Sequence, residues 1–342
     1  MSNSINTKLK KVLVIGLGQL GLPVAKYVND KGFDVSGYDI SSEAMIRAQE
    51  KIGLKTTTNF RNFDIYIICV STHNSSNITS PQIEGLISVI NKISMEANNG
   101  SLVSIESTIP KGTSKKIFEL LEHRLHVVHA PHRWYSLDEE KYGVNQLRVI
   151  GGVNPCCLKS GLEFYAGHSK YDTEKFTDEE ILNNYNKQEN KNTSFIEVQQ
   201  NFNDSNSLSN NNQQESQGCF QSLEIPMHSV SSIEVAELTK IIENSHRYLQ
   251  IAFAEELYLY CQANNILFSE LRDALNTKWN VEILEPRDGI GGHCLPKDTK
   301  MFLSSKMRSK ILQSAMEVDT LYRDFLTRRE KKLITSVDNL TN

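Results

Sequence analysis

A cysteine, a lysine and an aspartate stand close together in a glycine-rich stretch late in the chain. The stretch reads Gly289-Ile290-Gly291-Gly292-His293-Cys294-Leu295-Pro296-Lys297-Asp298. Glycines let a backbone turn sharply or approach a ligand closely, and a cation such as Lys297 favours the thiolate form of a nearby cysteine. The pattern suits a loop with a nucleophilic Cys294. It suits equally a tight turn around an unreactive buried thiol, because free cysteines often fill small spaces in a core.

A second pair of polar residues lies in the segment 231–264. This segment starts with two serines that can cap a helix, and its apolar residues recur at helical spacing. Lys240 and Asn244 are four residues apart, so they share one face of the predicted helix. On the residues alone, the pair reads as two solvated side chains. A helix this long, with so broad an apolar surface, also suits the interface of a homodimer.

A dinucleotide-binding fingerprint stands near the start of the chain. The apolar run 11–15 is followed by Gly16-Leu17-Gly18-Gln19-Leu20-Gly21 and then by the helical pattern 22–29. In this context the first glycine makes the turn, the second admits the pyrophosphate and the third lets the helix pack on the strand. The helix N-terminus then offers N–H groups to the phosphates.

Asp39 supports this interpretation and indicates the cofactor. It ends a second predicted strand, 33–38, about twenty residues after the glycines, as the fingerprint requires. A carboxylate there accepts hydrogen bonds from the ribose hydroxyls and repels a 2′-phosphate, and no arginine follows directly. We therefore expect NAD rather than NADP.

Strands and helices continue to alternate through the first half of the chain. Further strands are predicted at 64–70, 102–105, 125–129 and 147–150, and helices at 83–98 and 111–122. This alternation predicts an α/β fold: a Rossmann-type doubly wound parallel sheet, followed by an α-helical central domain with a long helix. Ligands of such sheets bind beyond the carboxyl ends of the strands. Thr72, Thr108 and the segment 131–133 are therefore expected to line the cofactor cleft.

Composition divides the chain into three parts. We expect an NAD-binding Rossmann domain at 1–167, a disordered Asn/Gln/Ser-rich insertion at 168–222, and a helical central domain with the Cys294 loop at 223–342. The insertion is almost free of apolar residues, so it cannot bury enough surface to offset its ordering entropy. A helical tail is predicted from 306 to about 337.

Charge and composition exclude several classes of partner. The net charge of −4 and pI of about 6.2 show no basic excess for nucleic acid or an anionic membrane. The longest apolar stretch, 12–25, is broken by glycines and too short to span a bilayer, and no convincing cleavage site marks a signal peptide. Six cysteines without CxxC spacing argue against a zinc site and a disulfide framework, and fit a cytoplasmic location.

A run of histidines does not change the expectation that the chain binds no metal. His123, His126, His129 and His132 recur at every third residue. Residues three apart on a strand alternate between its faces, so these four side chains are not expected to converge on one ion.

Six stretches together resemble the nucleotide-sugar dehydrogenase family, which includes the UDP-glucose, UDP-N-acetylmannosamine and GDP-mannose dehydrogenases. In the family's order they are VIGLGQLGLPVA, ICVST, IESTIPKGTS, RVIGG, AELTKIIEN and GIGGHCLPKDTK, spread over residues 10–155 and 230–305. The resemblance implies NAD-dependent oxidation of the C6 alcohol of a nucleotide sugar, most readily a UDP-sugar, to the carboxylate, in polysaccharide biosynthesis. The choice of sugar stays open, since GGHC favours the N-acetylmannosamine branch and LPKDTK the glucose branch.

The resemblance also implies a role for each site residue. Cys294 would attack the intermediate aldehyde, and the thiohemiacetal would then be oxidised to a thioester that water hydrolyses. Lys240 and Asn244 would stabilise the developing alkoxide and oxyanion, and Asp298 and Thr108 would position or deprotonate the water. The implied NAD contacts come from Gly16, Gly18, Gln19, Leu20, Gly21, Asp39, Thr72, Thr108 and Lys297.

Two departures from the family's pattern bear on these roles. His132 and Ser136 stand where the family usually has acids that help in hydrolysis; His132 either serves as the base, since its ordinary pKa is near neutral, or leaves the second oxidation impaired. The family also continues for about a hundred further residues that grip the nucleotide. We expect binding of the nucleotide to be weak, to be supplied by a separate chain, or to be absent.

Two other functions remain open from the sequence. A two-electron dehydrogenase of the hydroxyacid or 6-phosphogluconate type would also use a helix-borne lysine and asparagine, and would need no cysteine. A non-catalytic NAD-binding subunit would bind the cofactor and turn over only with a partner chain.

Overall fold

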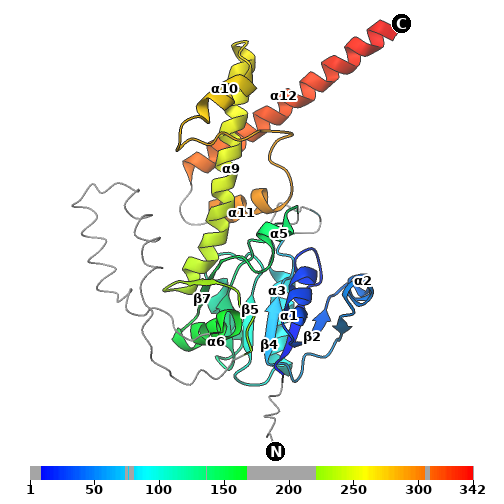
Figure 1. Cartoon of the computed structure of the whole chain (residues 1–342), viewed down its shortest axis with the longest axis vertical. Helices are drawn as coiled ribbons and strands as arrows, with labels where there is room; N and C mark the ends of the chain where they lie inside the picture. The colour runs from blue at the N-terminus through cyan, green and yellow to red at the C-terminus, as the bar shows by residue number, and fades with distance from the viewer. Residues whose placement is uncertain are drawn as a thin grey trace, which may run out of the picture.

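The computed structural model describes residues 9–73, 76, 81–135, 137–167, 221–304 and 309–341 (Figure 1). The predicted insertion therefore lies outside the described residues except for Gln221 and Ser222, and so does Ser136. The elements run in the order β1 (Lys11–Ile15), α1 (Gly21–Asp30), β2 (Asp34–Tyr38), α2 (Ser42–Ile52), β3 (Lys55–Thr56), β4 (Ile65–Ile68), α3 (Glu84–Glu96), β5 (Leu102–Ile105), α4 (Thr113–Leu120), β6 (His126–His129), α5 (Glu139–Tyr142), β7 (Arg148–Gly152), α6 (Pro155–Ala166), β8 (Met227–Ser229), α9 (Ile233–Ala263), α10 (Phe268–Leu275), α11 (Cys294–Leu303) and α12 (Lys310–Thr341).

Within the described residues, the strands form one sheet in the order β3-β2-β1-β4-β5-β6-β7-β8. Strands β1 to β6 pair in parallel, and the order reverses between β1 and β4, which is the crevice where doubly wound sheets bind nucleotides. The prediction of a doubly wound sheet is confirmed, with one exception. β7 runs antiparallel to β6, so its first residue, Arg148, lies at the carboxyl edge of the parallel strands.

Both faces of the sheet are covered, as the strand sequences require. Val12 and Val14 of β1 belong to one buried apolar cluster, with residues of α1 and α6. Leu13 and Ile15 belong to a second, with residues of α3 and α4. Because successive side chains of a strand point to opposite faces, a strand that is apolar at every position is buried on both sides.

The last strand of the sheet comes from beyond the predicted domain boundary. β8 pairs in parallel with β7, and Leu223 and Ile225 just before it are buried in the sheet's apolar cluster. Residues 223–229 therefore complete the Rossmann sheet instead of opening the helical domain, and α9 begins that domain. The sequence did not predict β8, because three residues carry too little periodicity to distinguish a strand.

The helical part of the chain rises from the β7 side of the sheet along α9 (Figure 1). α10 and α12 lie beside the far part of α9, and α11 lies where α9 leaves the sheet. A small core joins Tyr248 and Ala252 of α9 to Ile290 and Ala315. Among the described residues, no helix is both long and apolar enough to cross a membrane.

Candidate active site

The glycine-rich turn after β1 leaves room for a ligand. Gly16 adopts a φ of +91°, and a Cβ at that position would lie 2.6 Å from the carbonyl oxygen of Cys69. A Cβ at Gly21 would lie 1.6 Å from the carbonyl oxygen of Gly16, so α1 can approach the turn this closely only with glycine there. A Cβ on Gly18 would meet nothing within 4 Å. That open space is where the fingerprint places a pyrophosphate.

The N-terminus of α1 and Asp39 border the same turn. Leu20 gives α1 no side-chain cap, which suits a helix end that serves an anionic group, and Gln19 beside it is exposed. Asp39 accepts the N–H of Leu17 at 2.6 Å and the N–H of Ser41 at 2.9 Å. A carboxylate has about four acceptor positions, so Asp39 both fixes the turn and keeps capacity for ribose hydroxyls. These residues fit NAD.

Three of the predicted cofactor residues meet at the ends of β4 and β5. The Lys297 ammonium donates to Thr72 Oγ1 at 3.1 Å, and Thr72 Oγ1 donates to the carbonyl oxygen of Thr108 at 2.8 Å. Lys297 also forms an ion pair with Asp298 Oδ1 at 2.7 Å, and both are buried. The first turns of α11 are thereby held against the carboxyl edge of the sheet.

Four of the five residues that the family resemblance gives to the reaction lie on two packed helices, and the fifth, Thr108, follows β5. Cys294 and Asp298 are one turn apart on α11, and Lys240 and Asn244 are one turn apart on α9. The Asn244 amide donates to Asp298 Oδ2. The Asp298 carboxylate raises the pKa of Lys240, and so does Cys294 when it is ionised. The structure thus brings together residues separated by more than fifty positions in the sequence.

Cys294 is the first residue of α11, so the predicted loop ends one residue before it, at His293. The Cys294 side chain remains accessible to solvent, and its Sγ lies 3.5 Å from His293 Nε2. Desolvation by the surrounding protein and the Asp298 carboxylate raise the pKa of the Cys294 thiol, while Lys297 and Lys240 act in the opposite direction. The prediction that Lys297 favours the thiolate is therefore incomplete: its ammonium is paired with Asp298, and the thiol form prevails.

The Lys240 ammonium has a lowered pKa. Burial lowers its pKa, Arg133 adds to that shift, and the carboxylates of Glu243 and Asp298 oppose it. A lysine with a lowered pKa exchanges protons more readily near neutral pH. Lys240 is therefore suited to proton transfer with an alcohol.

A second charged cluster lies beneath the strand ends, centred on Glu106. His132 Nε2 pairs with Glu106 Oε2, Arg148 Nη1 lies 3.1 Å from Glu106 Oε1, and the Tyr165 hydroxyl donates to Oε1. All four side chains are buried. Burial alone would raise the pKa of Glu106, but the facing His132 and Arg148 lower it to about 2. Since Arg148 stays cationic throughout, it is the group that keeps Glu106 ionised at neutral pH.

His132 does not have the surroundings of the general base proposed from the sequence. Burial lowers its pKa to about 4, Arg148 adds to this, and Glu106 opposes it. A group with so low a pKa is a weak base at neutral pH, and His132 is paired with Glu106 inside the protein. The sequence did not predict Arg148 and Tyr165 as its neighbours, although an arginine in the apolar run RVIGG is a signal, since buried arginines are rarely unpaired.

Contacts from two sides fix the position of α9 relative to the sheet. The Glu237 carboxylate accepts the N–H groups of Gly112 and Ser114, the latter at 2.7 Å, and so caps α4. Glu243 forms a two-pronged pair with Arg133, the residue that follows His132. These contacts place Lys240 between two fixed points.

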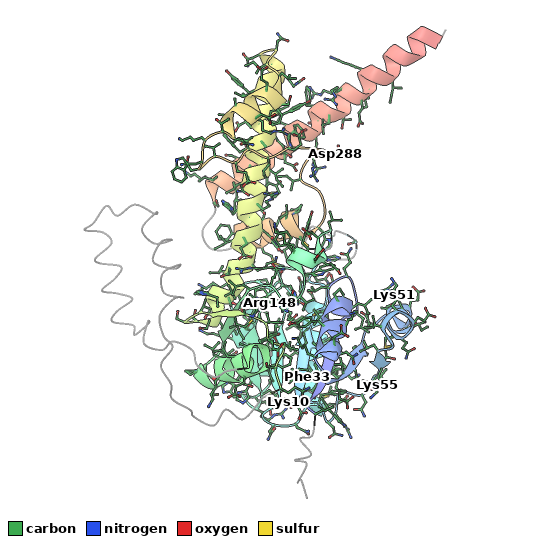
Figure 2. The ribbon with its side chains drawn as sticks, viewed as in Figure 1. Lys10, Phe33, Lys51, Lys55, Arg148 and Asp288 are labelled. Carbon is green, nitrogen blue, oxygen red and sulfur yellow. The ribbon has the colours of Figure 1, made fainter. Side chains whose placement is uncertain are left out.

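α12 holds the segment that leads into Cys294. Asp319 accepts the N–H of Ile290 at 3.0 Å, Arg323 donates to the Ile290 carbonyl, and the Tyr322 hydroxyl donates to the Arg287 carbonyl at 2.8 Å. Figure 2 shows the neighbouring Asp288 beside α12, whereas Arg148 lies lower, at the end of the sheet that faces the helices. The position of Cys294 therefore depends on α12 as well as on α9.

The fold and the fingerprint define an NAD-binding Rossmann protein with a helical second part. Residues 42–168 match the NAD binding domain of the UDP-glucose/GDP-mannose dehydrogenase family, and residues 234–320 match the central domain of the same family. The chain belongs to this family. The family named from the sequence motifs is thereby confirmed, as is NAD as the cofactor.

Relatives and solved structures agree with this assignment. UDP-N-acetyl-D-mannosamine dehydrogenase from Methanococcus vannielii is 26% identical over 334 residues, which cover 91% of this chain and 65% of that protein. The enzyme of the same name from Campylobacter jejuni is 25% identical, over 96% of this chain and 76% of that protein. The structure of the Pyrococcus horikoshii UDP-D-ManNAc dehydrogenase matches with a TM-score of 0.69 and 25% identity, over 96% of this chain and 72% of that one. The chain thus spans 65% of the length of the first of these relatives.

Proposed function

We propose that this chain oxidises the primary alcohol of a nucleotide sugar, with NAD as the oxidant and a UDP-N-acetylamino sugar of the mannosamine type as the substrate. The relatives named above support this substrate class. One observation carries the proposal. Lys240 and Asn244 on α9 face Cys294 and Asp298 on α11, next to the carboxyl ends of the parallel strands.

The first oxidation needs a group that manages the proton of the alcohol. Lys240 accepts that proton or stabilises the alkoxide, which its lowered pKa favours. The Asn244 amide is aligned by Asp298 and offers a further donor to the same oxygen. NAD, held by the glycine turn at Gly16–Gly21 and by Asp39, would supply the hydride acceptor for both oxidation stages.

The second oxidation uses Cys294 as a covalent carrier. Its sulfur bonds to the aldehyde carbon, and the thiol proton passes to the aldehyde oxygen. Loss of the second hydride and of the hydroxyl proton leaves a thioester. Water then bonds to the acyl carbon while the carbon–sulfur bond breaks, which releases the carboxylic acid and restores the thiol. In this scheme Asp298 and Thr108 position the water, and Lys240 stabilises the oxyanion.

An assay with paired cysteine variants tests this proposal. The purified chain is incubated with NAD and, separately, with UDP-N-acetylmannosamine, UDP-glucose and GDP-mannose, and NADH is followed by absorbance. Cys294→Ser is expected to abolish formation of the acid, whereas Cys156→Ser, at an exposed cysteine on α6, should match the unmodified chain. Full acid formation by Cys294→Ser would contradict the mechanism. NAD binding without NADH from any sugar would instead indicate a non-catalytic NAD-binding subunit.

A two-electron dehydrogenase is the second candidate, and His132 is the observation that favours it. Where the family usually has an acid that helps hydrolysis, this chain has a histidine that is buried, paired with Glu106 and lowered in pKa to about 4. Lys240 and Asn244 suffice for an alcohol oxidation that stops after one hydride. The two candidates differ in the number of NADH molecules formed per substrate molecule.

We also propose that α9 forms the interface of a homodimer. It exposes several large apolar side chains: Val235, Ile242, Phe253 and Tyr260. Helices with such a surface commonly bury it against a partner. Phe253→Glu is expected to shift the chain from dimer to monomer in light scattering after size exclusion, and an unmodified chain that is monomeric at micromolar concentration would contradict the proposal.

A further inference from the structure

Three side chains of types that bind metals meet at the amino ends of the parallel strands, opposite the cofactor cleft at their carboxyl ends. His126 is the first residue of β6, so it lies at the amino end of that strand. Cys156 and Cys157 lie in the first turn of α6. The ligand atoms of the three side chains are all within 4.8 Å of one another. Among the described residues, this is the group of histidines, cysteines and acids that meets the geometry for holding an ion.

The distances suit a tetrahedral metal site. Zn–S bonds of about 2.3 Å and Zn–N bonds of about 2.0–2.1 Å give a nitrogen-to-sulfur separation of about 3.6 Å across a tetrahedron. His126 Nδ1 and Cys156 Sγ are 3.8 Å apart. An ion placed between them needs only small side-chain rotations to reach bonding distance.

The surrounding backbone orients both cysteines without help from a metal. Asn154 caps α6, because its Oδ1 accepts the N–H of Cys157 at 2.9 Å, and the same oxygen lies 3.0 Å from Cys156 Sγ. The N–H of Val153 bonds to the carbonyl oxygen of Val127 at 3.2 Å and ties this turn to β6. Burial raises the pKa of the Cys157 thiol, and the positive end of the α6 dipole acts in the opposite direction on thiols of its first turn.

We propose that His126, Cys156 and Cys157 bind Zn²⁺, with Asn154 Oδ1 or a water molecule in the fourth position. Two thiolates and an imidazole select zinc over magnesium and calcium, which prefer oxygen ligands. Cys157 is buried and Cys156 is exposed, so the ion has one protein-enclosed side and one open path of entry. The bound ion would link α6 to β6. This proposal does not depend on the proposed catalytic function.

Titration of the full chain with Co²⁺ tests the site, because cobalt in a tetrahedral thiolate site gives an intense thiolate-to-metal absorption. One equivalent is expected to bind, with Zn²⁺ displacing it. Cys156→Ala and His126→Ala should each weaken binding by more than about 100-fold, since the loss of an outer-shell partner alone costs about 10- to 100-fold in affinity. Cys294→Ser is the matched control and should bind as the unmodified chain does, since Cys294 also has a histidine neighbour.

Thermal unfolding supplies a readout that is independent of the absorption. Zn²⁺ should raise the unfolding midpoint of the unmodified chain and of Cys294→Ser, and leave that of Cys156→Ala unchanged. Metal-free Cys156→Ala should unfold at the midpoint of the metal-free unmodified chain, since its side chain is exposed. Absence of the thiolate absorption from the unmodified chain, its survival in Cys156→Ala, or its loss in Cys294→Ser would each overturn the proposal.

Discussion

Glu106 beneath the strand ends and Glu255 in the helical part are both fully buried glutamates, yet their surroundings set opposite charge states. Glu106 is at most 2% exposed, faces Arg148 and His132, and has a pKa of about 2. Glu255 of α9 is buried to the same extent without a cationic partner at hydrogen-bonding distance. Burial, with the facing Asp319 carboxylate as the next cause, raises its pKa to about 8.

The difference shows how each half of the molecule supports the site. In the sheet, a permanent cation is buried with the carboxylate, so the charges beneath the cofactor cleft stay fixed. In the helical part, Asp319 carries both the contact with Ile290 and the proximity to Glu255, so the segment that leads to Cys294 adjoins a group that titrates. Asp298 resembles Glu106 in having a buried cation, Lys297, and a further donor, Asn244.

Removing the cation from the sheet is expected to have the largest effect on stability. Arg148→Met leaves Glu106 buried without its permanent partner, which should cost about 3–5 kcal/mol in the free energy of unfolding. Urea unfolding at pH 7 measures this. An unchanged midpoint would show that Glu106 does not depend on Arg148 for its charge state.

Removing the cation from the reaction site should affect rate and leave stability nearly unchanged. Lys240→Met is expected to lower kcat by about 10²- to 10³-fold, as the loss of one oxyanion-stabilising donor does elsewhere. The measurement is NADH formation at saturating sugar nucleotide, with urea unfolding as the control. A large loss of stability with little change in kcat would assign Lys240 a structural role instead.

Replacing Glu255 in the helical part by a neutral residue should increase the free energy of unfolding above pH 8. Because the folded pKa of Glu255 lies above its ordinary value of 4.5, the folded state holds the proton more tightly, and stability falls as pH rises from 4.5 through 8. Glu255→Gln removes this dependence and should be more stable than the unmodified chain above pH 8, by on the order of 2 kcal/mol. Parallel unfolding profiles for the two proteins would contradict the assignment.

The smallest effect is expected on the acid side, from His132. Its folded pKa of about 4 lies below the ordinary 6.5, so its contribution to stability is complete above pH 6.5 and is lost as pH falls through 4. His132→Asn removes this titration. The free energy of unfolding should therefore fall less between pH 6.5 and pH 4 than it does in the unmodified chain, by on the order of 1 kcal/mol. Buried His129, with a pKa of about 3, gives a slope of the same sign and remains in the variant as an internal reference.

The sequence predicted the parts of the fold that strong periodicity or a known spacing marks. The strand 102–105 and the long helix were placed to within two residues at each end, because an apolar run bounded by turns and a sustained helical repeat are clear signals. β7 was predicted as a strand, but its antiparallel direction, which brings Arg148 to Glu106, has no local signature.

The candidate site divides in the same way. Thr72, Thr108, Lys297, Asn244 and Asp298 do meet. Strand ends anticipated the positions of Thr72 and Thr108, and helical spacing anticipated the helix that carries Asn244. The sequence did not show the helix that begins at Cys294. It also did not show the group of His126, Cys156 and Cys157 at the amino end of β6. Cys156 stands thirty residues after His126 and Cys157 directly follows it, so only the packing of α6 on β6 brings the three together.

The measurement that tests the central claim most directly is the ratio of NADH formed to nucleotide sugar consumed when the reaction runs to completion. If Cys294 carries the aldehyde to the acid, the unmodified chain forms two NADH molecules per sugar and the carboxylate is the product. One NADH per sugar, with a ratio and rate that Cys294→Ala leaves unchanged, would contradict the account and leave Cys294 without a part in the chemistry.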